Sequence, residues 1–384
     1  MPGLVKMPSW TDCPLPATGP AMSPVPVHRP PLPVLAKVSW PDAAGPPPAA
    51  TAAALAAAAE RLASGQLVAI PTETVYGLAA NALDPDAVAL IFRAKGRPAT
   101  NPLIVHVADV AMAKRFASDW PEAAERATAT FWPGPLTLVV NKTAAVPDSV
   151  TAGGATVAVR CPSLLLTRKL IEVADCPLAA PSANRSEAVS PTTAQHVLEG
   201  LGNRVGMILD AGPCEHGLES TVLDCTVTPP RILRPGPISA NQLSEALGCD
   251  VVTPTPPAKE TSAGAGQGTA SVARSPGQRL RHYAPRTPLE VTSDAPAVVK
   301  ALLAAGQQVG WLARHPANAS VRELAASAGL LVVPMPESPA AYGKGLYATL
   351  HALDQRGLDR LVADPVPDDA DWAAVRDRLQ RAAS

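Results

Sequence analysis

The sequence has little net charge, no paired cysteine motif and no long apolar run. Its 384 residues carry a formal net charge of -1, so no strong overall field is present to attract nucleic acid. The six cysteines are scattered without C-x-x-C spacing, which argues against a zinc site and against a small disulfide scaffold. We therefore predict reduced thiols and no metal site built from protein ligands.

Signals for membranes and export are also missing. No stretch reaches the roughly 18 to 20 uncharged apolar residues that a membrane span needs. The N-terminus has no charged start followed by an apolar core, and prolines interrupt it throughout. We expect a cytoplasmic protein without membrane contact.

The common nucleotide and hydrolase motifs do not occur. The sequence contains no P-loop, no G-x-G-x-x-G fingerprint, no H-E-x-x-H and no G-x-S-x-G. Any nucleotide site must therefore be assembled from other groups.

What is present divides the chain into four parts. Residues 1–50 hold 14 of the 44 prolines, which remove backbone donors, so we predict a disordered extension without helix or sheet. Residues 51–250 alternate between helix and strand patterns and form the expected catalytic domain. Residues 251–286 are rich in Pro, Gly and Thr and are interpreted as a flexible linker. Residues 287–384 form a second, smaller domain.

The patterns predict two α/β units. In the first, expected strands lie at 67–70, 103–107, 136–140, 156–159, 177–180, 207–209, 221–223 and 231–233, and expected helices at 51–64, 84–95, 163–174 and 239–247. Long connections there favour a mixed, twisted sheet. In the second, expected strands at 289–291, 308–312, 330–333 and 360–362 alternate with helices at 295–304, 321–328, 339–355 and 372–382, which is typical of a small parallel sheet.

Three segments carry groups suited to anionic ligands. Pro-Thr-Glu-Thr-Val-Tyr-Gly-Leu at 71–78 follows a strand end, where ligands bind in α/β sheets, although a self-bonded threonine turn is the more common explanation for such a segment taken alone. Lys95 and Arg97 flank a glycine and suit a polyanion, or they simply cap the end of a helix. Ser182, Asn184 and Ser190 favour a phosphate site, with a plain helix cap at Ser190 as the alternative. His106, on an apolar strand, is either catalytic or a core histidine.

Together, and in this order, these segments resemble the threonylcarbamoyl-AMP synthase family with its YrdC-type domain. The similarity also includes Asn-Pro-Leu-Ile-Val-His at 101–106, Trp-Pro-Gly-Pro-Leu-Thr at 132–137, Val-Ala-Val-Arg at 157–160, Gly-Leu-Glu-Ser-Thr-Val at 217–222 and Leu-Arg-Pro-Gly-Pro at 233–237. Ser-Pro-Gly-Gln-Arg-Leu-Arg-His-Tyr-Ala-Pro at 275–285 resembles the linker of the longer form, which adds a C-terminal Rossmann-like domain.

The resemblance implies an enzyme that converts L-threonine, bicarbonate and ATP into threonylcarbamoyl-AMP and pyrophosphate, for the N6-threonylcarbamoyladenosine of tRNA. The product would pass to a tRNA threonylcarbamoyl transferase complex, and Mg²⁺ would accompany ATP without a carboxylate cage. Implied threonine-binding residues are Thr74, His106, Arg160, Ala180 and Ser220. Implied ATP-binding residues are Arg97, Asn101, Thr156, Ser182, Ser190 and Arg234. Lys95, Arg97 and His106 are the catalytic candidates, and we place Lys95 and Arg97 at a solvent-facing helix end.

Other interpretations stay open at this point. A non-catalytic double-stranded RNA or tRNA-binding module of the same fold is one alternative, although acidic residues outnumber basic ones over 61–250 and at most a weak, local tRNA contact is expected. A carbamoyltransferase of the hydrogenase-maturation type is another, but its additional domains are not found here. The segment 275–285, with Arg279, Arg281, His282 and Tyr283, is interpreted as an active-site lid or as a structural linker.

Overall fold

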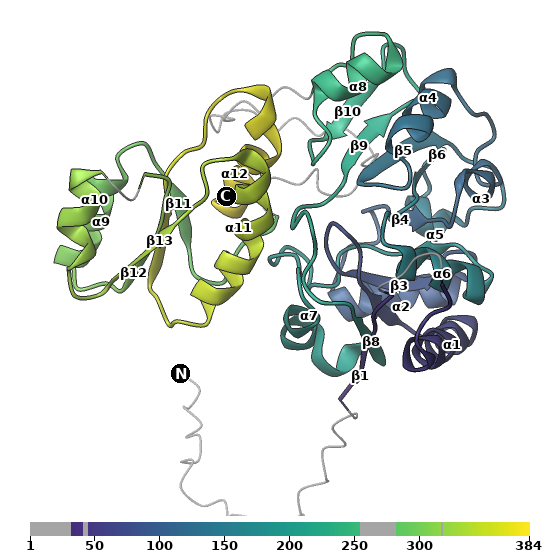
Figure 1. Cartoon of the computed structure of the whole chain (residues 1–384), viewed down its shortest axis with the longest axis horizontal. Helices are drawn as coiled ribbons and strands as arrows, with labels where there is room; N and C mark the ends of the chain where they lie inside the picture. Colours follow the sequence, from purple (N-terminus) through teal and green to yellow (C-terminus); the bar gives the residue numbers. More distant parts are fainter. Residues whose placement is uncertain (1–31, 41–44, 254–281, 316–317) are drawn as a thin grey trace, which may run out of the picture. The chain divides into compact units, whose positions relative to one another are not determined.

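A computed structural model of the chain describes residues 32–40, 45–253, 282–315 and 318–384. The large-sheet region, residues 32–253, contains β1 (Val34–Lys37), β2 (Val68–Ile70), β3 (Gly77–Asn81), β4 (Ile104–His106), β5 (Leu136–Asn141), β6 (Thr156–Arg160), β7 (Leu178–Ala179), β8 (Met207–Asp210), β9 (Thr221–Asp224) and β10 (Arg231–Arg234). These strands form one mixed sheet in the order β1-β8-β2-β3-β7-β4-β6-β5-β9-β10 (Figure 1).

Helices cover both faces of this sheet. They are α1 (Ala49–Ala63), α2 (Pro85–Lys95), α3 (Val110–Lys114), α4 (Glu122–Phe131), α5 (Asp148–Thr151), α6 (Leu165–Ala174), α7 (Ala194–Leu201), a 3-10 turn η1 (Gly202–Arg204) and α8 (Ala240–Leu247). Because side chains alternate along a strand, Val68 and Ile70 of β2 pack with α1 and α6, whereas Ala69 belongs to the core that includes α2, α4, α7 and α8.

Local signals in the sequence explain where α2 begins and ends. The Asp84 carboxylate accepts hydrogen bonds from the amides of Asp86 and Ala87, Pro85 occupies the first turn, and Gly96 ends the helix in the left-handed region at φ 64°. The predicted start and end of this helix are confirmed, and they bring Lys95 and Arg97 to its C-terminal end.

The small-sheet region, residues 289–384, has a parallel sheet of its own. Its elements are β11 (Leu289–Val291), α9 (Ala295–Ala304), β12 (Val309–Ala313), α10 (Ala319–Ala325), β13 (Leu330–Pro334), α11 (Pro339–Asp354), β14 (Arg360–Ala363), η2 (Ala370–Trp372) and α12 (Ala373–Ala382). The strand order is β11-β14-β12-β13, and every pair is parallel. The predicted fold class, a mixed sheet followed by a small parallel one, is confirmed.

Side-chain alternation on β12 separates the two cores of the small-sheet region. Val309, Trp311 and Ala313 pack with α9 and α10, whereas Leu312 points to the opposite face and packs with α11 and α12. Figure 1 shows α9 and α10 on one side of this sheet and α11 and α12 on the other. This arrangement places α11 and α12 together on one face of the sheet.

Two strands, β1 and β3, lie where none was expected. The prediction that residues 1–50 form no regular helix or sheet is wrong for 34–37, because β1 pairs in parallel with β8 over four residues at the edge of the large sheet. An edge strand tolerates nearby proline, since only one side of its backbone enters the ladder. Residues 1–31 lie outside the described residues.

Two further expectations concern residue environment. In the part of the chain that the structure describes, Cys161, Cys176, Cys214 and Cys225 are buried free thiols and Cys249 is an exposed one; Cys13 lies outside it. No helix within the described ranges is long and apolar enough to cross a membrane.

Candidate active site

The candidate site is a pocket at strand ends of the large sheet. His106 of β4 and Arg160 of β6 are neighbours in parallel register, so their side chains leave the sheet on the same face. The pocket is lined by Thr72, Thr74, Val75, Gly77, Arg97, Ile104, His106, Arg160, Ala180, Pro181, Ser182, Glu219, Ser220, Arg234, His282 and Tyr283. Three arginines and several hydroxyls therefore converge on one small space.

The threonine-rich turn between β2 and β3 is self-bonded and also lines the pocket. The Thr72 hydroxyl lies 2.8 Å from the Thr74 hydroxyl and accepts from the amides of Thr74 and Val75. It donates to the Val75 carbonyl at 2.6 Å. The interpretation of a self-bonded threonine turn is confirmed, and the internal bonds fix the Thr74 hydroxyl at the pocket wall. Its role in ligand binding stays a prediction.

Arg160 is held by a buried carboxylate. Its Nη2 lies 2.6 Å from Oε1 of Glu73, and both side chains are almost fully buried. Burial opposes ionisation of Glu73, but Arg160 outweighs it and holds the pKa of Glu73 below its usual range. Burial, followed by the charge of Arg160, lowers the pKa of His106 to about 3. His106 is therefore a neutral imidazole at neutral pH.

Lys95 and Arg97 are buried, so the expectation of a solvent-facing helix end is wrong. Lys95 is 2% exposed, and its Nζ donates to the carbonyls of Ser182 and Asn184 at 2.5 and 2.6 Å. Burial and the neighbouring Arg97 lower the pKa of Lys95 well below its usual value. Arg97 donates to the carbonyls of Asn101 and Pro102 and reaches the pocket. Lys95 fixes the 182–184 loop rather than lining the pocket.

Ser190 contacts a carboxylate instead of capping a helix. Thr193 is the N-cap of α7, and its side chain accepts from the amide of His196. The Ser190 hydroxyl donates to Oε1 of Glu219 at 2.5 Å. The helix-cap alternative for Ser190 is therefore wrong, and Ser190 stands beside the pocket behind Glu219.

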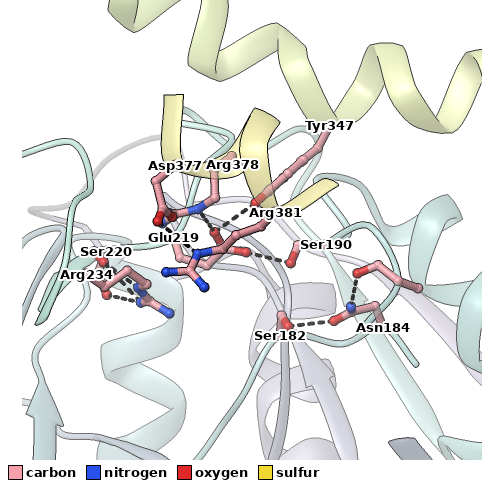
Figure 2. A network of polar contacts seen from close by, with 11 residues as sticks. Ser182, Asn184, Ser190, Glu219, Ser220, Arg234, Tyr347, Asp377, Arg378 and Arg381 are labelled. Atoms are coloured by element: carbon pink, nitrogen blue, oxygen red, sulfur yellow. Dashed lines mark hydrogen bonds and ion pairs between the residues drawn. The ribbon is translucent and has the colours of Figure 1, made fainter. Parts of the chain in front are cut away.

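Ser220 and Arg234 meet at the start of β9 and the end of β10. Arg234 Nε and Nη2 donate to the Ser220 carbonyl at 3.1 and 3.0 Å, and Nη2 also lies 3.1 Å from the Ser220 hydroxyl (Figure 2). That hydroxyl is 2.7 Å from the Thr137 hydroxyl on β5. Gly236 lets the chain pass close to this corner, since a Cβ there would lie 2.3 Å from the Thr221 nitrogen.

Tyr283 reaches the site from the segment that precedes β11. It is buried and has φ 62°, a left-handed conformation that a tyrosine adopts only when its surroundings enforce it. Burial, followed by the charge of Glu219, raises the pKa of Tyr283. Arg279 and Arg281 lie outside the described residues.

The structure brings most of the predicted site residues together. Thr74, Arg97, His106, Arg160, Ala180, Ser182, Ser220, Arg234 and Tyr283 line the pocket, whereas Lys95, Asn101, Thr156 and Ser190 do not. Thr156 lies four residues before Arg160 on β6, about 13 Å along an extended strand, so its role in ATP binding stays a prediction. The sequence analysis assigned no role to Glu73 or Glu219. The only sequence signal for these two residues is that each is a carboxylate inside a hydroxyl-rich motif.

The described residues contain no group of three or more His, Cys, Asp or Glu side chains placed to hold a metal ion. Both carboxylates at the site are engaged by arginine, Glu73 by Arg160 and Glu219 by Arg378. A metal ion in this pocket would therefore be coordinated by oxygens of the bound small molecule.

A mixed α/β sheet with a buried pocket of arginines and hydroxyls at its strand ends defines a protein that binds small anionic molecules. Comparison with known proteins narrows this class. Residues 60–236 match a family model described as "Telomere recombination", and residues 238–384 match one described as "Threonylcarbamoyl-AMP synthase, C-terminal domain".

Several curated proteins similar to this chain are named threonylcarbamoyl-AMP synthase. Threonylcarbamoyl-AMP synthase of Bacillus subtilis is 39% identical over 331 residues, covering 85% of this chain and 91% of the relative, and that of Pyrococcus abyssi is 37% identical over 326 residues, covering 83% and 90%. A crystal structure of P. abyssi Sua5 complexed with L-threonine has a TM-score of 0.77 at 35% identity and covers 91% of this chain and 97% of its own.

The chain belongs to the threonylcarbamoyl-AMP synthase family. The predictions of this family and of a nucleotidyltransferase-type enzyme are confirmed by relatives that match both halves of the chain. The alternative of a non-catalytic RNA-binding module finds no support in these relatives.

Proposed function

We propose that this chain forms threonylcarbamoyl-AMP and pyrophosphate from L-threonine, bicarbonate and ATP. The observation that carries this proposal is the convergence of Arg97, Arg160 and Arg234 on one buried pocket that also holds His106 and Ser220. Threonine, bicarbonate and ATP all carry negative charge, so a site that joins them needs several cations in a poorly solvated space.

Threonine binds at the His106 and Arg160 end of the pocket. Arg160 pairs with the threonine carboxylate, because a guanidinium fixed by Glu73 presents its remaining N–H groups in a rigid plane. Thr74, Ala180 and Ser220 complete this end, and neutral His106 offers a hydrogen bond to a polar group of threonine.

ATP binds at the end that contains Arg97, Ser182 and Arg234. Asn101, Thr156 and Ser190 do not line the pocket and stay predicted ATP contacts. Mg²⁺ arrives as part of the MgATP substrate, held by phosphate oxygens and water. The arginines offset the charge of the α-phosphate while its bond to the leaving pyrophosphate breaks.

The reaction has two balanced steps. The threonine nitrogen attacks the bicarbonate carbon and loses a proton, and the carbon releases water to leave a carbamate. A carbamate oxygen then attacks the α-phosphorus of ATP, and the P–O bond to the β-phosphate breaks. Catalysis rests on positioning and electrostatic stabilisation, because His106 stays neutral and Lys95 faces the 182–184 loop.

Buried Tyr283 covers one side of the pocket and excludes water from the mixed anhydride product, which fits the predicted lid role of this tyrosine. The product passes, in the cytoplasm, to the transferase complex that modifies tRNA.

Omission experiments test this proposal. Pyrophosphate release from ATP is measured with threonine, bicarbonate or both left out, and the expected result is release only in the complete mixture. Equal release without threonine would contradict the proposed reaction.

A further inference from the structure

The small-sheet region contacts a pocket residue of the large-sheet region through one carboxylate. Glu219 lines the pocket, and its Oε2 accepts from Arg378 Nε at 2.9 Å and from the Tyr347 hydroxyl at 3.0 Å. Tyr347 is on α11 and Arg378 on α12. Figure 2 shows Glu219 between these two side chains and Ser190.

Without this contact, the negative charge of Glu219 would weaken the binding of anionic groups in the pocket. A carboxylate at the pocket wall repels bicarbonate, the carboxylate of threonine and the phosphates of ATP unless a cation neutralises it. Arg378 is fully buried, and its guanidinium lies 5.0 Å above the Tyr283 ring, so its charge has little solvent to screen it. Arg378 therefore supplies the closest counter-charge to Glu219.

His351 of α11 also connects the small-sheet region to Ser190 and to α7. His351 Nε2 on α11 lies 3.1 Å from the Ser190 carbonyl, and the His351 ring stacks on His196 of α7 at 3.9 Å between ring centroids. The other carboxylate oxygen of Glu219 accepts a hydrogen bond from the Ser190 hydroxyl. The position of Ser190 thus depends on α11 from two sides.

Loss of Arg378 would change the partners of Arg234. Burial would raise the pKa of Glu219, but Arg378 first and Arg234 second lower it to about 2. Without Arg378, the carboxylate has Arg234 as its remaining strong cation, and a pair between them would withdraw Arg234 from Ser220 and from phosphate.

We propose that Arg378 is a positioning residue for the ATP end of the pocket: it neutralises Glu219, which keeps Arg234 available to phosphate and holds Ser190 in place. The small-sheet region would then complete the site. This inference rests on the proposed function for its substrate, but it can be measured by binding alone.

The test uses the full-length protein and the affinity for a Mg²⁺ complex of an ATP analogue with an uncleavable α,β-bridge, determined by calorimetry at pH 8. Arg378→Gln is compared with Arg378→Gln/Glu219→Gln, which removes both charges, and with Tyr347→Phe. Arg376→Gln is the matched control, because Arg376 is on the same helix but donates to the carbonyls of Pro367 and Asp369.

We expect Arg378→Gln to weaken analogue binding at least tenfold at pH 8. The double variant should recover most of the affinity, Tyr347→Phe should weaken binding about threefold, and Arg376→Gln should bind like the parent protein.

A double variant as weak as the single one would overturn the proposal. If Arg378→Gln does not fold, the double variant decides, since it leaves no unpaired charge at Glu219 and Asp377 keeps its pair with Arg381. A double variant that folds and binds supports the inference; one that fails to fold or to bind overturns it. Absence of threonine-dependent pyrophosphate release would contradict the proposed function but leave this binding result intact.

Discussion

Two buried arginine–glutamate pairs border the same pocket, and they differ in which partner faces the ligand. In the Arg160–Glu73 pair the arginine lines the pocket and the glutamate stands behind it. In the Arg378–Glu219 pair the glutamate lines the pocket and the arginine stands behind it on α12. The first pair therefore presents a cation to substrate, whereas the second removes an anion from its path. The comparison makes opposite predictions for double substitutions.

Loss of Arg160 should have the largest effect. Arg160→Gln removes a charge-assisted contact with the threonine carboxylate, about 1.5 to 3 kcal/mol, and leaves Glu73 unpaired at a stability cost of about 3 to 5 kcal/mol. Calorimetric titration should show threonine affinity falling about tenfold or more, and thermal unfolding should show a lower melting temperature. Arg185→Gln, at an exposed arginine, is the control.

The double variant Arg160→Gln/Glu73→Gln sharpens the comparison. It should regain stability, because no buried charge is left unpaired, yet still bind threonine as weakly as the single variant. Recovered threonine affinity would show that the two pairs work alike and that Arg160 does not bind substrate.

Lys95 offers a third arrangement, a buried cation held by carbonyl oxygens. Lys95→Met leaves the acceptors of Ser182 and Asn184 unpaired, each at about 1 to 3 kcal/mol. We expect a lower melting temperature together with lower turnover. The control is Arg93→Met on the exposed face of the same helix. An unchanged melting temperature with lost turnover would instead assign Lys95 to direct contact with phosphate.

Acid should reveal the Glu219 pair by its effect on folding. The folded-state pKa of Glu219 is about 2, below its ordinary value of 4.5, so the pair contributes stability above pH 4.5 that is lost as the pH falls toward 2. Unfolding free energy measured across this range should fall less steeply for Glu219→Gln. Identical slopes for the two proteins would mean that Glu219 is not held by Arg378 in solution.

The smallest effect is expected at the sheet edge, where no buried charge is involved. Deleting residues 1–40 removes β1 and leaves β8 paired only with β2, so the melting temperature should be lower than after deletion of residues 1–31. Equal melting temperatures would mean that β1 contributes nothing to stability.

The sequence predicted well wherever the signal was local. The capped helix from Asp84 to Lys95 depends on side chains within one turn of each end, and the four parallel strands of the small-sheet region alternate regularly with helices. β3 was missed because Gly77–Asn81 contains no β-branched residue, and β1 was missed because prolines surround its four residues.

Contacts between distant residues could not be predicted. The buried Lys95 donates hydrogen bonds to carbonyls that lie 87 and 89 residues further along the chain. Glu219 pairs with Arg378, which lies 159 residues away in sequence. The sequence around each of these residues does not indicate which distant residue it contacts. The resemblance to a known family predicted most of the pocket, whereas the carboxylates that orient or neutralise its arginines needed the structure.

The most direct measurement is mass-spectrometric identification of the product that accumulates when the full-length protein is given L-threonine, bicarbonate and MgATP. The account predicts threonylcarbamoyl-AMP together with pyrophosphate, in amounts that require all three substrates. Release of ADP and phosphate, with no threonine-containing adenylate, would contradict it.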